Sequence, residues 1–135
     1  MKNIREDKGY TYGISSHLYA LQDTGYFTIG TDVNYEAEED TLVQIQKEIN
    51  LLQTELISEE ELQLVKNYLL GSFTNSLSAP FAAIDKFKVL QRQGLDLSFY
   101  DSYIDSIQSV SAERLMDLAN QYLQWDSLSL SIVGK

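Results

Sequence analysis

The spacing of apolar residues divides the chain into three parts. Apolar and polar residues alternate in two segments at the start and in one segment at the end, and the part between them has the spacing of helices. Apolar and polar residues alternate from Gly9 to Leu21 and again from Tyr26 to Val33, a pattern typical of half-buried strands. The residues between them, 22–25, read Gln-Asp-Thr-Gly, and these residue types favour a turn. The first part of the chain therefore predicts a β-hairpin.

The central part of the chain carries apolar residues three and four positions apart, which predicts amphipathic helices. The apolar face of the first helix consists of Leu42, Ile45, Ile49, Leu52 and Leu56. Ser58 opens a second helix, and Pro80 then interrupts the pattern because it lacks a backbone donor. Helical spacing resumes from Phe81 to Leu90, and Gly94 ends this helix. Another helix is predicted from Ser98 to Val110, and Ser111 caps a last one. We expect four or five helices.

From Leu128 to Val133, apolar residues alternate with serines, which predicts a third strand. The long helical connection lets this strand return beside the hairpin. The sequence thus predicts an α+β fold, in which an antiparallel sheet (the hairpin plus the C-terminal strand) has four or five helices packed on one face. No internal repeat or linker marks a boundary, so we expect residues 1–135 to form a single domain.

Composition narrows the classes of partner. Ten basic residues against twenty acidic ones give a net charge of -10, and because phosphate backbones would be repelled, we expect no nucleic-acid partner. No apolar run approaches the roughly 18 residues that a membrane span needs, so we expect no membrane partner. The absence of cysteine is compatible with any compartment. We expect a soluble protein and favour the cytoplasm over the periplasm.

The sequence contains few residues of the types that bind a metal ion. His17 is the single histidine and there is no cysteine, so neither the HExxH nor the HxxEH zinc motif can be built. We therefore expect no metal, no cofactor and no catalytic residue in this chain, and we interpret His17 as a surface side chain of the first strand. The acidic clusters at 36–40 and 59–61 lie at helix starts, where the helix dipole and capping account for them.

Arg5 and Tyr12 are the candidate binding residues. They lie seven positions apart on either side of a turn expected at Gly9, and a reversal there would let a guanidinium and a phenol point into one space. From the residues alone, the favoured interpretation is structural: a solvated helix end for Arg5 and a strand aromatic packed on its neighbours for Tyr12.

The segment from Ile4 to Ser16 resembles the signature of the pitrilysin/insulinase family of zinc peptidases, which includes the mitochondrial processing peptidase. The resemblance is to the half that does not bind the metal. The residues that stand in the positions of the signature are Arg5, Glu6, Asp7, Lys8, Gly9 and Tyr12. The order of the later segments is also similar to the layout of the family, so the likeness covers essentially the whole chain.

The resemblance implies that two related halves face each other across a closed chamber, with zinc held on an HxxEH motif in the other half. It implies that Arg5 and Tyr12 bind substrate, the guanidinium holding a peptide carbonyl and the phenol donating to the oxyanion. The partners would be a peptide or unfolded polypeptide and the zinc-binding half, in the same chain or a companion chain. Zinc is expected in that half if the parent is active.

The resemblance also implies a C-terminal peptidase-like domain that lacks its N-terminal strands, a fragment of a longer protein that is inactive alone. We expect such a fragment to form a homo-oligomer because a strand edge would be uncovered. Two alternatives stay open: a non-catalytic partner or structural subunit of the same fold, and an unrelated α+β protein-interaction domain. An intact HxxEH motif upstream or in a companion protein would distinguish a peptidase from a non-catalytic subunit.

Overall fold

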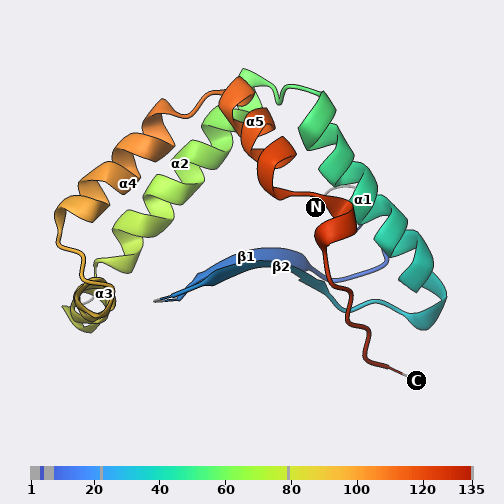
Figure 1. Ribbon diagram of the computed structural model, residues 1–135, viewed down its shortest axis with the longest axis horizontal. Coiled ribbons are helices and arrows are strands. Elements are labelled where there is room, and N and C mark those ends of the chain that lie inside the picture. Colours follow the sequence, from blue (N-terminus) through green and yellow to red (C-terminus); the bar gives the residue numbers. More distant parts are fainter. Residues whose placement is uncertain (1–3, 5–7, 22, 79, 135) are drawn as a thin grey trace. The chain divides into compact units, whose positions relative to one another are not determined.

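A β-hairpin followed by five α-helices makes up the computed structural model, which describes residues 4, 8–21, 23–78 and 80–134 (Figure 1). The elements are β1 (Ile14–Ala20), β2 (Gly25–Thr31), α1 (Glu38–Thr54), α2 (Glu59–Ser76), α3 (Pro80–Arg92), α4 (Ser98–Ser109) and α5 (Ala112–Tyr122), with short 3-10 helices η2 (Tyr35–Ala37) and η3 (Trp125–Ser127). This content confirms the predicted α+β class.

The chain divides into two compact units. The first consists of Met1–Glu55 and Met116–Lys135, and the second of Leu56–Leu115. That they together form one domain, with the helices on one face of the sheet, stays a prediction.

The hairpin forms as predicted, with antiparallel pairing from Ile14 opposite Thr31 to Ala20 opposite Gly25. The N–H of Leu21 donates to the carbonyl of Thr24 at 2.8 Å and closes the turn. A Cβ added at Gly25 would lie 2.9 Å from the carbonyl oxygen of Tyr19, a separation too short for a side chain there. Glycine at this position thus permits the close approach of the strands.

Both strands are shorter than predicted. The first begins at Ile14 and not at Gly9, and the second runs from Gly25 to Thr31 and not to Val33. The reason lies in local hydrogen bonds: the Thr11 hydroxyl bonds both the N–H and the carbonyl of Gly13. Such side-chain bonds compete with the ladder and keep this segment irregular.

The prediction of a third strand from Leu128 to Val133 is wrong. The described residues form a single sheet with the strand order β1-β2, and Val133 is 96% exposed. Alternation shows that side chains suit a pleated, half-buried surface, but a strand also needs a neighbour whose backbone groups are free to pair. In the described part of the chain, this segment pairs with neither β1 nor β2.

In the first unit, α1 and the end of α5 are held together by side-chain amides. The Gln53 amide donates to the carbonyls of Ala119 at 3.3 Å and Leu123 at 2.8 Å. In return the Asn120 amide donates to the carbonyl of Gln53 at 2.9 Å. Ala119 and Ile49 of these helices are buried. The carbonyl of Ala119 also accepts from the N–H of Leu123, so the side-chain amides add to the backbone bonds at these two helix ends.

In the second unit, the helix ends confirm the predicted signals. The Ser58 hydroxyl accepts from the N–H of Glu61 at 3.2 Å at the start of α2, and Ser111 accepts from the N–H of Arg114 at the start of α5. Gly94, with φ +69°, ends α3, and the N–H of Leu95 donates to the carbonyl of Leu90, a glycine C-cap.

The packing of α2 against α4 centres on Phe73. Its ring lies 5.2 Å from the ring of Tyr100 and 5.5 Å from that of Tyr103, distances at which tilted aromatic pairs attract. The Tyr100 hydroxyl donates to the carbonyl of Lys86 at 3.2 Å and so joins α4 to α3. Desolvation by burial raises the pKa of the Tyr100 hydroxyl above its ordinary value.

Candidate functional site

The segment that leads into β1 reverses direction at Gly9. Gly9 has a φ of +66°, a conformation that residues with a Cβ adopt at a cost. The N–H of Tyr10 donates to the carbonyl of Ile4 at 3.1 Å across this reversal, and Ile4 is buried. The chain therefore turns at Gly9, as the sequence predicts.

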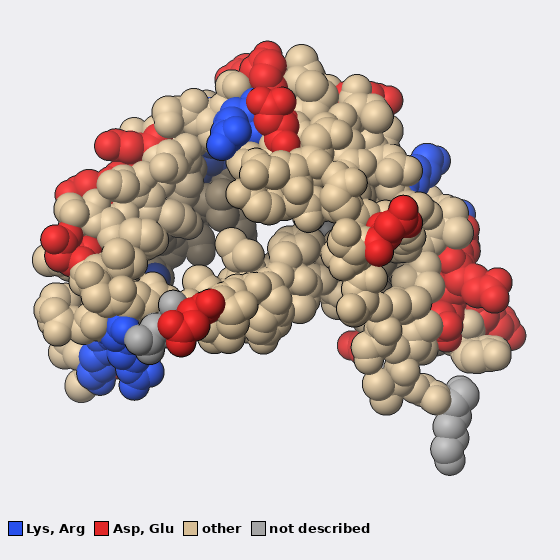
Figure 2. Space-filling view, in the orientation of Figure 1, with Lys and Arg blue, Asp and Glu red and all other residues tan. Residues whose placement is uncertain are grey.

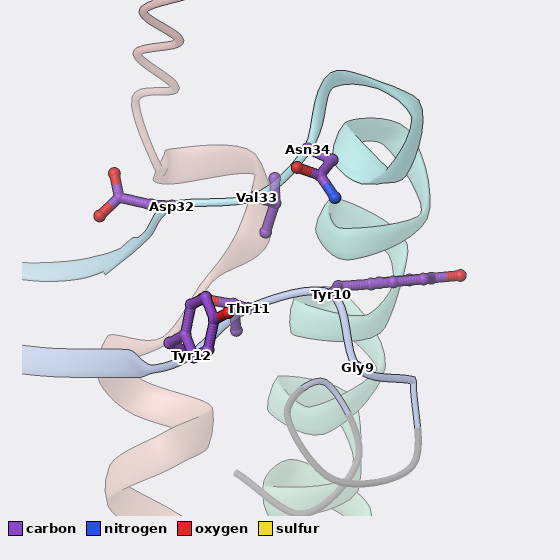
Figure 3. A pocket seen from close by; sticks show the side chains of 7 residues that line it. All are labelled: Gly9, Tyr10, Thr11, Tyr12, Asp32, Val33 and Asn34. Atoms are coloured by element: carbon purple, nitrogen blue, oxygen red, sulfur yellow. The ribbon is translucent and has the colours of Figure 1, made fainter.

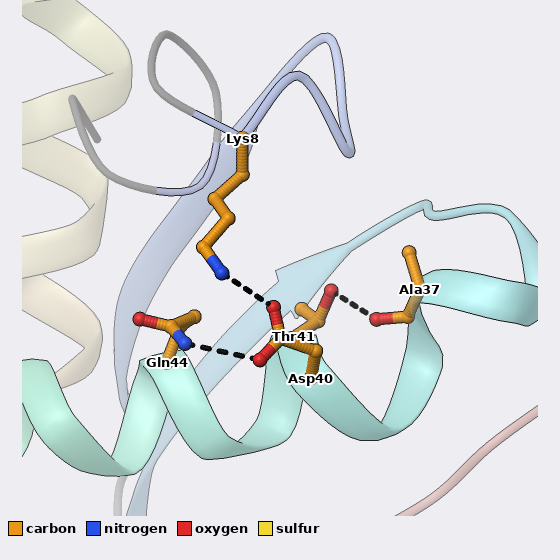
Figure 4. Close-up of polar contacts among 5 residues, drawn as sticks. All are labelled: Lys8, Ala37, Asp40, Thr41 and Gln44. Carbon is orange, nitrogen blue, oxygen red and sulfur yellow. Dashed lines mark hydrogen bonds and ion pairs between the residues drawn. The ribbon is translucent and has the colours of Figure 1, made fainter.

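An ion pair holds the turn on α1. The Lys8 ammonium lies 2.9 Å from an Asp40 carboxylate oxygen, and the amide of Gln44 donates to the other oxygen at 3.1 Å (Figure 4). The hydrogen bond from Lys8, then those from Tyr10 and Gln44, hold the pKa of Asp40 below its ordinary value. The same bond to Asp40 raises the pKa of Lys8. The start of α1 thus fixes the residue that precedes the turn.

A second group of polar contacts joins the two chain segments at the open end of the hairpin. The Thr31 hydroxyl lies 3.0 Å from the Thr11 hydroxyl and 3.1 Å from the carbonyl of Gly13. Thr31 ends β2, and Thr11 precedes β1. These contacts keep the segments together where the ladder has ended.

A pocket of about 660 Å³ lies at this open end of the hairpin (Figure 3). It is lined by Gly9, Tyr10, Thr11, Tyr12, Asp32, Val33 and Asn34. In Figure 3 the Tyr10 side chain extends toward α1, whereas the Tyr12 side chain points in a different direction from that of Tyr10. The Tyr12 side chain is fully exposed, at 101%. Its phenol is therefore free to meet a ligand or a partner surface.

The structure places only one of the two predicted binding residues. Tyr12 lines the pocket, while Arg5, with Glu6 and Asp7 of the same signature, lies outside the described residues. That Arg5 and Tyr12 share one space stays a prediction.

Sequence reasoning missed the second wall of the pocket, formed by Asp32, Val33 and Asn34. The signal was present in the hairpin register. Extending the antiparallel pairs one step beyond Ile14 and Thr31 places Asp32 opposite Gly13. Expecting both strands to continue into this region obscured the pocket, because residues of a regular ladder would have been paired.

His17 lies in β1 opposite Thr28 and is exposed, with its ring 6.1 Å from that of Tyr19. Within the described ranges, no three His, Cys, Asp or Glu side chains form a group that could hold a metal ion. The described residues therefore do not provide the ligand set of a zinc site. In the same part of the chain, no helix is long and apolar enough to cross a membrane.

Comparison with known proteins identifies the family. Residues 1–69 match the family model described as the peptidase M16 inactive domain, which covers half of the chain. The chain belongs to the peptidase M16 inactive domain family. This family assignment confirms the resemblance carried by the segment from Ile4 to Ser16.

Two relatives are similar to nearly all of this chain. A Bacillus subtilis (strain 168) protein named uncharacterized zinc protease YmxG is 27% identical over 128 residues, 93% of this chain and 31% of that protein. The crystal structure of a peptidase M16 inactive domain from Pseudomonas fluorescens superimposes with a TM-score of 0.80 at 25% identity, over 92% of this chain and 29% of that one.

A protease from Helicobacter pylori shares the M16 fold with a TM-score of 0.72 at 20% identity, over 91% of this chain and 30% of that one. At this identity the likeness shows the fold alone. The chain spans less than a third of the length of each of the three relatives.

Proposed function

We propose that this chain is the substrate-binding, non-catalytic part of a zinc-dependent metalloendopeptidase of the M16 family. The zinc-binding half lies in the same parent protein or in a companion chain. The observation that carries the proposal is the position of Tyr12: a signature residue of the family, it lines a pocket and is fully exposed. The name of the Bacillus subtilis relative, a zinc protease, supports the same class of activity.

The ligand is a peptide or an unfolded polypeptide. A phenol can donate a hydrogen bond to the oxyanion that develops when a peptide carbonyl is attacked. A guanidinium at Arg5 would hold a neighbouring carbonyl through its fork of donors. The ion pair of Lys8 with Asp40 and the contacts of Thr31 support this role, since they fix both ends of the segment that carries Tyr12.

The test is Tyr12→Phe in the complete, active assembly. Removal of one oxyanion donor typically lowers kcat by about 10²–10³, and the fold should be unaffected because the side chain is exposed. Arg5→Ala should mainly raise KM, because it removes an interaction that the ground state already makes. Steady-state kinetics on a fluorogenic peptide measure both effects.

Tyr68→Phe is the matched control for this experiment. Tyr68 is an exposed tyrosine of α2, so loss of its hydroxyl should change neither kcat nor KM. If Tyr12→Phe also keeps the wild-type kcat, the phenol has no part in the chemistry and the proposed role of Tyr12 is wrong.

We also propose that the chain self-associates. In the part of the chain that the structure describes, β1 and β2 pair only with each other, so each strand has an outer edge of backbone donors and acceptors. Free edges and exposed apolar helix faces both promote association. Light scattering across micromolar concentrations tests this second proposal, since a self-associating chain should have a mass above that of one chain. The result does not depend on the role proposed for Tyr12.

A further inference from the structure

The pocket beside Tyr12 has a negative charge in its wall. Among the described residues that line the pocket, only Asp32 carries a full charge, and the others are glycine, tyrosine, threonine, valine and asparagine. Asp32 is exposed and forms no ion pair with another described residue. Lys8, which directly precedes the pocket, is already paired with Asp40. The Asp32 carboxylate is therefore available to a positively charged ligand.

Hydrogen bonds of the neighbouring residues hold Asp32 close to Tyr12. The Thr31 hydroxyl lies 3.0 Å from the hydroxyl of Thr11 and 3.1 Å from the carbonyl of Gly13. Thr31 directly precedes Asp32, and the other two residues flank Tyr12. The Thr11 hydroxyl also donates to the carbonyl of Gly13 at 2.9 Å. The segments that carry the carboxylate and the phenol are thus bonded to each other on the same side of the hairpin's ladder.

The rest of the pocket suits a long basic side chain. Tyr10, Tyr12 and Val33 contribute rings and methyl groups, and in Figure 3 the Asp32 side chain extends in the opposite direction from that of Tyr10. Lysine and arginine combine an apolar stem with a cationic head, so the stem can lie along the apolar walls while the head pairs with the carboxylate. The N-terminal ammonium of a peptide offers the same charge without the stem. The volume of about 660 Å³ lies within the range of roughly 300–1,000 Å³ that is typical of ligand pockets.

We propose that Asp32 is a specificity-determining residue, through which this pocket selects peptides that carry a positive charge next to the part bound by Tyr12. The charge is that of an arginine or lysine side chain or of a free N-terminal amine. The proposal rests on the proposed function and names the class of peptide that the site takes. The expected preference is modest, because an exposed ion pair changes affinity by about fivefold at most and is weakened by salt.

The acidity of the whole chain gives a background against which this preference is measured. Figure 2 shows acidic side chains at many places on the visible face, and a net charge of -10 attracts any basic peptide to some extent. The preference that we assign to the pocket is therefore the part that depends on Asp32 alone.

Peptide binding to the complete assembly, treated with chelator so that peptides stay intact, tests the proposal. Fluorescence anisotropy gives the Kd of an acetylated, otherwise neutral peptide with one arginine, placed at each position in turn, and of the same peptide with citrulline, which has nearly the same shape and no charge. A second pair, citrulline peptides with free and acetylated N-termini, tests the terminal amine. Wild type should bind the charged member of at least one pair about three- to fivefold more tightly at low salt, and Asp32→Asn should remove the difference.

Glu36→Gln is the matched control, since Glu36 is exposed and lies outside the pocket lining. It removes one negative charge, as Asp32→Asn does, but should keep the preference. Asp32→Lys should make the uncharged peptide the tighter ligand, and circular dichroism shows that each variant is folded.

Three results overturn the proposal: no preference in wild type, a preference that Asp32→Asn leaves unchanged, or a loss of affinity in Asp32→Asn that is equal for both members of a pair. Because binding is measured without turnover, these results are separate from the effect of Tyr12→Phe on kcat. If Tyr12→Phe lowers kcat while Asp32→Asn keeps the preference, only the role of Asp32 is wrong and the proposed function stands.

Discussion

Among single side chains, Lys8 shows which contacts could be predicted from the sequence and which could not. The sequence named Lys8 only as one residue of the signature beside Gly9, and the structure pairs it with Asp40, 32 positions away. No local pattern predicts a contact over that separation, because it depends on how α1 packs against the turn. For Asp40 the sequence predicted only a favourable position at a helix start.

The Lys8–Asp40 pair makes the segment before β1 sensitive to pH. The pKa of Asp40 is lowered from 3.8, so its contribution to stability is present above this value and is lost as pH falls through the lower folded-state pKa. The pKa of Lys8 is raised from 10.5, so its contribution is present below 10.5 and is lost as pH rises through the higher folded-state pKa.

Asp40→Asn should therefore increase amide hydrogen exchange of residues 9–13 relative to wild type at pH 7. The difference between the two proteins should become smaller when the pH is below the lowered pKa of Asp40, because the wild-type carboxylate is then protonated as well. The effect should be modest, because both side chains are exposed to screening solvent and salt. Hydrogen exchange followed by mass spectrometry measures it, with Asp23→Asn as a control of equal charge in the hairpin turn. Equal exchange in Asp40→Asn and wild type at pH 7 would mean that the pair does not hold the turn.

Among helices and strands, local signals predicted the starts and ends of helices well. Ser58 and Ser111 cap helices and Gly94 ends one, because capping depends on a few neighbouring residues. The segment from Leu128 to Val133 has equally clear alternation and forms no strand. A strand needs a partner elsewhere in the chain, and a periodicity of two carries no information about that partner.

Ser58→Ala should lower the free energy of unfolding by about 1 kcal/mol, because the N–H of Glu61 loses its acceptor at the start of α2. Ser72→Ala, in the exposed interior of the same helix, is the matched control and should be neutral or slightly stabilising, since alanine favours helix. Urea unfolding followed by circular dichroism gives both values. If the two variants are equally stable, the cap contributes nothing to α2.

At the scale of the whole molecule, the segment from Ile4 to Ser16 predicted the family, and residues 1–69 match the model of that family. This segment was informative because its residues combine a turn, a charged side chain and an aromatic in a specific order. The division into two units was not predicted. Contacts within each unit, such as those of Phe73 with Tyr100 and Tyr103 in the second, join residues far apart in the sequence, which no single segment specifies.

The chain alone should retain no stoichiometric zinc and should show no chelator-sensitive peptidase activity. It has one histidine and no cysteine, and tight zinc sites use three or four ligands that are mostly His and Cys. His17 is exposed on β1, with its ring 6.1 Å from that of Tyr19. The zinc of an active assembly should instead depend on the half that supplies HxxEH.

Elemental analysis of protein purified without chelator measures the zinc content, with the complete assembly as a positive control at about one equivalent. Because isolated carboxylates bind zinc weakly, any metal acquired at the acidic helix starts should be removed by dialysis. One equivalent that survives dialysis of this chain and is lost in His17→Ala would show a site centred on the single histidine. In that case the metal could no longer be assigned only to the other half.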